Sequence, residues 1–166
     1  MCGAKKVIAI EPAPKNFQSA KKNVELNGLS NKIDLIMAGC SDKEGSISVG
    51  AANSGIIYSL ENDEQKEIKV PLTTLSEILK YVEASPCILK MDCEGCEYET
   101  ILSASKEILS NFSHLQIEYH FGYKNLKTKL ENCGFDVKVT KPRIGKRLFQ
   151  ESKKTFYGYI FAKRKL

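Results

Sequence analysis

The 166-residue sequence predicts an α/β fold built on a mostly parallel β-sheet. Short apolar runs of strand length alternate along the chain with longer segments whose apolar residues recur at helical spacing. The strand-like runs are almost continuously apolar, which is typical of strands covered on both faces. Since no linker or low-complexity stretch interrupts this alternation, we expect one domain over residues 1–166.

The first part of the chain is predicted to hold a strand at 6–11, a helix from Pro14 to about Asn27, and a strand at 33–38. Pro14 suits the first turn of that helix, and Gly28 suits its C-cap.

The next part differs, because glycines punctuate three short β-like pieces, SISV, GIIYSL and EIKVPL, within residues 42–72. This pattern favours a hairpin or β-excursion beside the main sheet. Thr74 is expected to cap a helix over 75–83, with Glu77 at the capping-box position.

The second half returns to the alternation of strands and helices. The predicted elements are strands at 87–92, 115–120, 135–139 and 155–162, and helices at 97–109 and 123–133. A charged loop without a helix, at about 142–154, joins the last two strands, so these should pair antiparallel.

The composition of the chain restricts where the protein is expected in the cell and what it is expected to bind. No run approaches the roughly 20 apolar residues that cross a bilayer, and the N-terminus lacks a signal-peptide pattern. We therefore expect a cytoplasmic protein without a membrane span. The net charge of +5 is modest and sits largely in 163–165, which we interpret as a solvated terminus. Nucleic acid is not an expected partner.

Six cysteines are present, and Cys93 and Cys96 form a CxxC. Without a secretory signal, we expect free thiols. No second ligand pair at similar spacing completes a zinc site. Asp92, Glu94 and Glu97 surround the CxxC with negative charge, which disfavours thiolates and hence a redox function. We interpret the two cysteines as small residues in tight packing.

Acidic residues gather at the predicted strand ends, where ligands of open parallel sheets bind. Glu11 ends the first strand and is positioned to accept the ribose hydroxyls of an adenosine, with Pro12 holding it extended. The alternative is that Glu11 favours the N-terminus of the following helix. Asp92 and Glu94 follow a later strand and suit a metal or a substrate hydroxyl, unless Lys90 is simply a counter-ion.

Glu118 and His120 should share one face at the next strand end. A carboxylate beside an imidazole favours the protonated histidine. His120 is therefore a candidate general base or metal ligand, and the alternative is a hydrogen-bonded surface histidine.

Four stretches, in this order, closely resemble the FkbM family of methyltransferases: VIAIEPAPKNFQSAKKNVELNGLSNKI, AGCSDKEG, LKMDCEGCEYETIL and IEYH. The resemblance covers about residues 3–140, and its xxAIEPxPxNF and KxDxEGxE motifs are specific when taken together. It implies a Rossmann-like class I methyltransferase fold, a three-layer sandwich whose mostly parallel sheet ends in an antiparallel strand. It also implies S-adenosylmethionine as donor and O-methylation of a hydroxyl on a small molecule, sugar or glycolipid.

The resemblance and the residue patterns together assign the site. The residues expected to bind the cosubstrate are Glu11, Pro12, Ser41 and Asp42. The residues expected to act in catalysis are Asp92, Glu94 and His120. Use of a divalent metal is unknown, and its ligands would be Asp92, Glu94, Glu118 and His120. These groups should converge around one adenosine-sized cleft that also takes the small-molecule acceptor.

The start of the chain departs from the family. A first strand and a glycine-rich loop precede the KVIAIEP segment in the family, whereas this chain begins MCGA. We therefore expect an N-terminal truncation and two unpaired strand edges, which predicts a homo-oligomer formed through those edges. Two other functions stay open: a degenerate methyltransferase-like module for binding or oligomerisation, and an RNA methyltransferase. The latter is disfavoured because no NPP-type turn follows the strand that ends in MDCEG.

Overall fold

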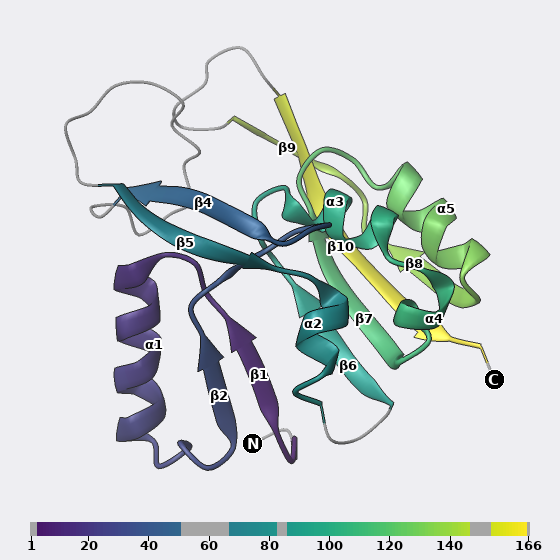
Figure 1. Cartoon of the computed structure of the whole chain (residues 1–166). Coiled ribbons are helices and arrows are strands. Elements are labelled where there is room, and N and C mark those ends of the chain that lie inside the picture. The colour runs from purple at the N-terminus through teal and green to yellow at the C-terminus, as the bar shows by residue number, and fades with distance from the viewer. Residues whose placement is uncertain (1–2, 51–66, 83–85, 147–153, 166) are drawn as a thin grey trace. The chain divides into compact units, whose positions relative to one another are not determined.

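The chain forms two compact units in a computed structural model, Met1–Tyr81 and Val82–Leu166 (Figure 1). The structure describes residues 3–50, 67–82, 86–146 and 154–165.

The first unit begins with a βαβ arrangement. β1 (Val7–Ile10) and β2 (Ile33–Ile36) pair in parallel, and α1 (Pro14–Leu26) connects them. Gly28 closes α1 with a positive φ of 64°, and its N–H donates to the Glu25 carbonyl, which confirms the predicted C-cap.

A second, smaller sheet in the same unit confirms the β-excursion predicted for residues 42–72. Its strands are β3 (Gly39–Cys40), β4 (Gly45–Gly50) and β5 (Glu67–Thr73). β3 runs parallel to β5, and β4 pairs antiparallel with β5. Val49 and Val70 from these strands pack with Ala13 in a small buried core. The predicted piece GIIYSL lies outside the described residues.

Thr74 begins α2 (Leu75–Leu79) as predicted, since its side chain accepts a hydrogen bond from the Glu77 N–H at 3.2 Å. The helix is shorter than the predicted 75–83. Its last backbone bonds, from Lys80 and Tyr81, reach back three residues instead of four, which ends the α-helix in a turn.

The second unit is built on a sheet with strand order β6–β7–β10–β8. Its strands are β6 (Cys87–Met91), β7 (Phe112–Tyr119), β8 (Phe135–Val139), β9 (Arg143–Lys146) and β10 (Lys154–Arg164). β6 and β7 are parallel. β10 lies between β7 and β8 and runs antiparallel to both, which confirms the predicted antiparallel last strand.

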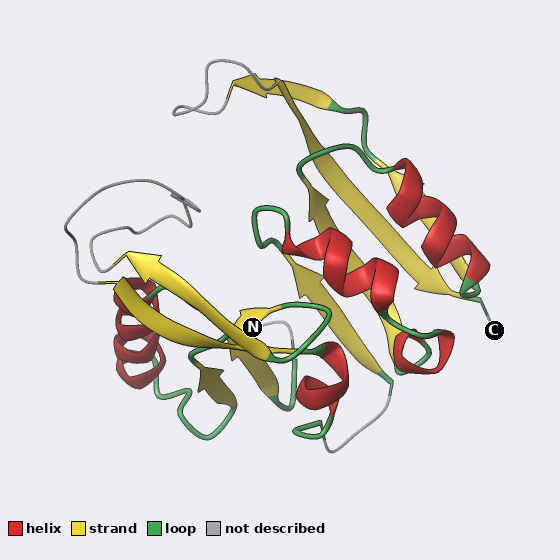
Figure 2. Cartoon of the chain, turned by 45° about the horizontal axis from the view of Figure 1, so that its top comes forward, coloured by secondary structure: helices red, strands yellow, loops and turns green. Residues whose placement is uncertain are grey.

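Helices cover one face of this sheet. They are α3 (Cys96–Ser103), α4 (Lys106–Leu109) and α5 (Lys124–Asn132). Figure 2 shows α3 and α5 lying across the same face. Leu126 and Leu130, one turn apart on α5, are buried, as are Leu115 and Ile117 on alternate positions of β7. This packing fixes the end of β7, from which candidate site residues extend.

Two predicted segments were wrong in detail. The helix predicted over 97–109 is divided, because the backbone at Ala104 is extended (φ −59°, ψ 133°) and the Ser105 side chain begins α4 by accepting from the Ile108 N–H. The loop predicted at 142–154 contains β9, which pairs antiparallel with the start of β10.

Open strand edges are present in both units. Among the described residues, β1 pairs with β2 alone and β6 pairs with β7 alone. None of the helices in the described ranges is long and apolar enough to cross a membrane.

Candidate functional site

The carboxyl edge of the sheet in the second unit gathers the polar residues that were predicted there. β6, β7 and β8 all point the same way, because β6 is parallel to β7 and β10 is antiparallel to both β7 and β8. Asp92 follows β6, His120 follows β7 and Thr140 follows β8 at this edge. Ligands of parallel sheets bind at such an edge.

His120 is a buried residue, held by a second buried residue that sequence reasoning did not place in the site. Its Nδ1 lies 3.0 Å from Oε1 of Glu97, whose side chain is 0% exposed. Because a carboxylate only accepts, the Nδ1–H donates to Glu97, and Nε2 faces away from it. The arrangement fixes both the orientation and the tautomer of the ring.

Neighbouring carboxylates raise the pKa of His120 above its ordinary value of 6.5. The hydrogen bond to Glu97 is the largest cause, and the charges of Glu94 and Glu118 act in the same direction, whereas burial opposes them. The sequence predicted this direction but assigned it to Glu118. Glu97 is the main hydrogen-bond partner of His120, because α3 places its carboxylate next to the imidazole.

A tight turn between β6 and α3 carries Glu94 toward the histidine. Glu94 has a positive φ of 55°, and Gly95 has a φ of 125°, which favours glycine. The Gly95 N–H donates to Oε2 of Glu97 at 2.7 Å, so Glu97 supports the turn and the imidazole together. Glu94 Oε1 lies 3.6 Å from Nε2 of His120.

Cys93 and Cys96 are joined by a disulfide, so the expectation of free thiols was wrong for this pair. The turn at Glu94 and Gly95 brings their Cα atoms to 5.6 Å, which the residue spacing alone does not reveal. Cys87 and Cys133 are free, as expected. The disulfide closes the loop from which Glu94 extends.

Asp92, Glu118 and His120 form one cluster. Each offers a ligand atom within 4.8 Å of the others, and the set combines carboxylate oxygens with an imidazole nitrogen, donors that divalent transition metals bind. The counter-ion interpretation also has support, because Nζ of Lys90 lies 3.8 Å from Oδ2 of Asp92. Both partners of that pair are exposed, and such pairs contribute little to stability.

Two tyrosines complete this region and were not predicted. The Tyr98 hydroxyl donates to the Gly122 carbonyl at 2.6 Å and accepts from the Phe121 N–H at 2.8 Å, which ties α3 to the residues after His120. Tyr159 of β10 is the register partner of Glu118, and a hydrogen bond to this carboxylate raises the pKa of Tyr159. Sequence alone could not predict the register of β10 against β7.

The residues predicted to bind the cosubstrate all lie in the first unit. Glu11 Oε1 accepts from the Ala13 N–H at 2.7 Å, at the N-cap of α1, a contact of the kind that the helix-terminus interpretation expects, and its role toward the ribose stays a prediction. Pro12 stands between them. At the next strand end, the buried Ser41 donates through Oγ to Oδ1 of the exposed Asp42 at 3.1 Å.

The structure thus brings together the predicted residues of each unit. It joins Asp92, Glu94, Glu118 and His120 at one sheet edge, and it adds Glu97 to them. The convergence of these residues with Glu11 around one cleft stays a prediction.

Comparisons with known proteins agree on the fold and the family. The family model described as the methyltransferase FkbM domain matches residues 1–137. The structure is similar to the methyltransferase FkbM from Methylobacillus flagellatus KT, with a TM-score of 0.53, 16% identity and coverage of 94% of this chain and 36% of that one. The chain therefore spans little more than a third of that protein's length.

A weaker similarity links the chain to the precorrin-6y C5,15-methyltransferase from Geobacter metallireducens GS-15, with a TM-score of 0.48, 14% identity and coverage of 96% of this chain and 68% of that one. No curated protein matches the chain. The family match extends over most of the chain and includes both groups of site residues, and the fold is that of the Rossmann-like class I methyltransferases. The chain belongs to the methyltransferase FkbM domain family.

Proposed function

We propose that this chain carries the site of an S-adenosylmethionine-dependent methyltransferase that methylates a hydroxyl on a small molecule, a sugar or a glycolipid. Membership of the family supports methyl transfer. The observation that carries the choice of a hydroxyl is the buried His120–Glu97 pair, which directs Nε2 toward Glu94. A hydroxyl needs a base to become a good nucleophile, and an oriented imidazole is the commonest one.

The cosubstrate is proposed to bind at the strand ends of the first unit, on Glu11, Pro12, Ser41 and Asp42. A carboxylate has two oxygens and about four lone-pair positions, so the one bond from Ala13 leaves Glu11 able to accept ribose hydroxyls. S-adenosylmethionine supplies the electrophilic methyl group, and the protein positions the acceptor oxygen against it.

Proton removal is proposed to fall to His120 or Asp92, with Glu94 orienting the acceptor. Nε2 can take a proton from the acceptor hydroxyl only when the imidazole is neutral, so activity through His120 rises with pH as the ring loses its proton. Because Glu97 raises the pKa of His120, that rise is displaced upward from the ordinary value of 6.5. Glu97 and Tyr98 are positioning residues, since they hold His120 and the residues that follow it.

The same side chains suit a divalent cation, whose use remains unknown. Asp92, Glu94, Glu118 and His120 would be its ligands, and a cation there would lower the pKa of a bound acceptor hydroxyl and so replace proton removal by the histidine. The fixed Nδ1–H donation to Glu97 suits this alternative too, since metal-bound histidines usually donate their other N–H to a carboxylate or carbonyl.

Assembly through the open strand edges is proposed as well. The free edges of β1 and β6 present backbone groups that another strand can pair with. A second copy of the chain would satisfy them, and size-exclusion chromatography with light scattering would report a homo-oligomer. Residues 1–166 are proposed to form a single methyltransferase domain in the cytoplasm.

Titration calorimetry with S-adenosylhomocysteine tests the proposal. We expect binding that Glu11→Gln weakens roughly tenfold, because one charge-assisted pair of hydrogen bonds to the ribose is lost. Glu25→Gln, an exposed residue on α1, is the matched control and should bind like the wild type. An absence of heat and of any thermal shift at millimolar ligand would instead favour a degenerate module for binding or oligomerisation.

A further inference from the structure

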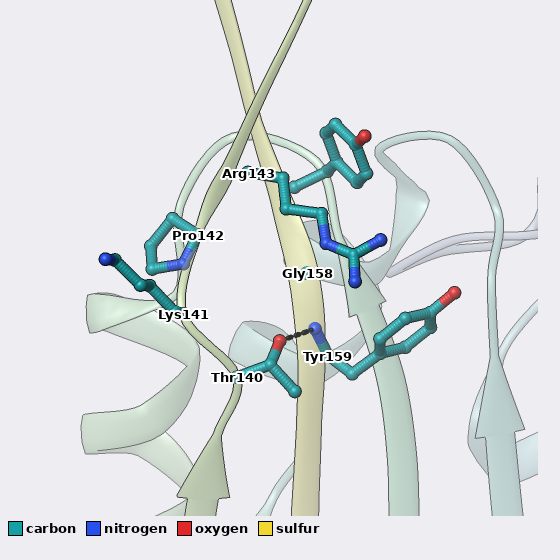
Figure 3. A pocket seen from close by; sticks show the side chains of 7 residues that line it. Thr140, Lys141, Pro142, Arg143, Gly158 and Tyr159 are labelled. Carbon is teal, nitrogen blue, oxygen red and sulfur yellow. Dashed lines mark hydrogen bonds between the residues drawn. The ribbon is translucent and has the colours of Figure 1, made fainter.

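A pocket lies beside the acidic cluster in the second unit, and none of the residues assigned to cosubstrate binding, catalysis or metal binding lines it. It has a volume of about 310 Å³ and is formed by the turn after β8 together with the start of β10 (Figure 3). Arg143, Tyr157 and Tyr159 supply its functional side chains. Its volume is at the lower end of the range for small-molecule sites.

The backbone around the pocket is fixed by hydrogen bonds. Thr140 pairs with Tyr159 twice, since its Oγ1 accepts from the Tyr159 N–H at 2.8 Å and its own N–H donates to the Tyr159 carbonyl at 2.9 Å. Gly158 directly precedes Tyr159, and a Cβ there would come within 2.5 Å of the Tyr119 hydroxyl oxygen and 2.8 Å of Thr140 Oγ1. The wall of the pocket is therefore held in place before any ligand binds.

Tyr159 connects the pocket to the cluster at the end of β7. It faces Glu118 across the β7–β10 pair, and its hydroxyl donates a hydrogen bond to that carboxylate. The charge of Asp92 raises the pKa of the Tyr159 hydroxyl, whereas the charge of Arg143 lowers it. Tyr159 thus interacts with groups of both signs.

Arg143 is available as an anion-binding group. In Figure 3 its guanidinium points to the Tyr159 side of the pocket, whereas Lys141 points to the other side. Among the described residues, Arg143 makes no ion pair. A guanidinium presents paired N–H donors that match carboxylate or phosphate oxygens.

The geometry points to a methyl acceptor that carries an anionic group, a carboxylate or a phosphate, bound by Arg143, with its hydroxyl directed past Tyr159 to Asp92 and His120. The identity of the reaction in this inference rests on the proposed function, whereas the anion site does not depend on it. The charges set the orientation of the acceptor, because the carboxylates of the cluster repel its anionic end and Arg143 attracts that end. Tyr159 separates the two ends and provides a ring surface for the body of the acceptor.

Titration of the full chain with inorganic phosphate and, separately, with acetate tests the inference by amide NMR. Both anions should shift the amides of Thr140, Lys141, Arg143 and 157–159, and the anion that binds more tightly identifies the group. Arg143→Gln should weaken that binding roughly tenfold, and Arg143→Lys should restore part of it. Lys138→Gln removes the same charge from an exposed position on β8 and should leave the affinity within about twofold.

Two results would overturn the inference: no shift of these amides with either anion, or an equal loss of affinity in Arg143→Gln and Lys138→Gln. Matching thermal unfolding curves for the variants exclude misfolding, since both residues are exposed. Anion binding without S-adenosylhomocysteine binding would contradict the proposed function and support the anion site. S-adenosylhomocysteine binding without anion binding would contradict the anion site and support the proposed function.

Discussion

Replacing Glu97 by glutamine tests how the candidate base is held. Glu97 is fully buried and accepts two hydrogen bonds, from Nδ1 of His120 at 3.0 Å and from the Gly95 N–H at 2.7 Å. A glutamine of similar shape keeps one acceptor oxygen but turns an N–H₂ group toward the other donor. While the ring keeps its proton on Nδ1, one of the two bonds is lost, together with the negative charge.

The expected cost follows from those contacts. Loss of one hydrogen bond to a charged group costs about 1.5–3 kcal/mol. In a chain of this size, each kcal/mol lowers the unfolding midpoint by roughly 2–4 °C, so Glu97→Gln should unfold roughly 3–12 °C earlier. The pKa of His120 should fall, because its largest upward cause is removed.

The pH dependence of stability has a defined sign. The folded protein raises the pKa of His120 above the unfolded value of about 6.5. The pair therefore stabilises the fold fully below that unfolded value, and this contribution is lost as the pH rises through the raised, folded value. Glu97→Gln should reduce the stability difference between acidic and alkaline pH.

NMR titration of the imidazole signals provides the assay, since the chain has two histidines, His114 and His120, and His114→Gln assigns them. Glu99→Gln on the exposed side of α3 is the matched control for charge removal and should leave the pKa of His120 nearly unchanged. The reasoning is refuted if His120 titrates at or below 6.5 in the wild type, or if both variants move it equally.

Three further predictions concern the elements around the site. Thr74→Ala should cost about 0.5–2 kcal/mol in urea unfolding through loss of the α2 cap, and an unchanged midpoint would contradict the assigned cap. Tyr98→Phe should cost about 1–3 kcal/mol because two hydrogen bonds to backbone groups are lost. It should also shift the amides after β7, and shifts confined to α3 would count against that link. Cys93 and Cys96 should resist alkylation in denaturant until a reductant is added, as read by intact mass, and immediate labelling would disprove the disulfide.

Much of the fold could be predicted because its signals are local. The apolar runs and the glycine and proline positions predicted β1, α1 and β2 to within about two residues of their bounds. The helix-free connection predicted the antiparallel last strand. The break at Ala104 was missed because Ser105 is compatible with both a helix interior and a cap, and only the tertiary packing chooses between them.

The site was predictable in part, for the same reason. Asp92, Glu94, Glu118 and His120 stand at strand ends, and a parallel sheet brings strand ends together. Glu97 was missed because its burial depends on how α3 packs. Tyr159 and Arg143 were missed because they reach the region through β10 and β9, whose register no local pattern reports.

The proposed function depends on the prediction that Glu11 and Asp92 serve the same methyl-transfer reaction. Amide NMR during titration with S-adenosylhomocysteine tests it most directly. The amides of Glu11 and Ala13 and those of Asp92–Gly95 are expected to shift together and to report the same dissociation constant. Shifts restricted to one of these two segments, or none at millimolar ligand, would contradict it.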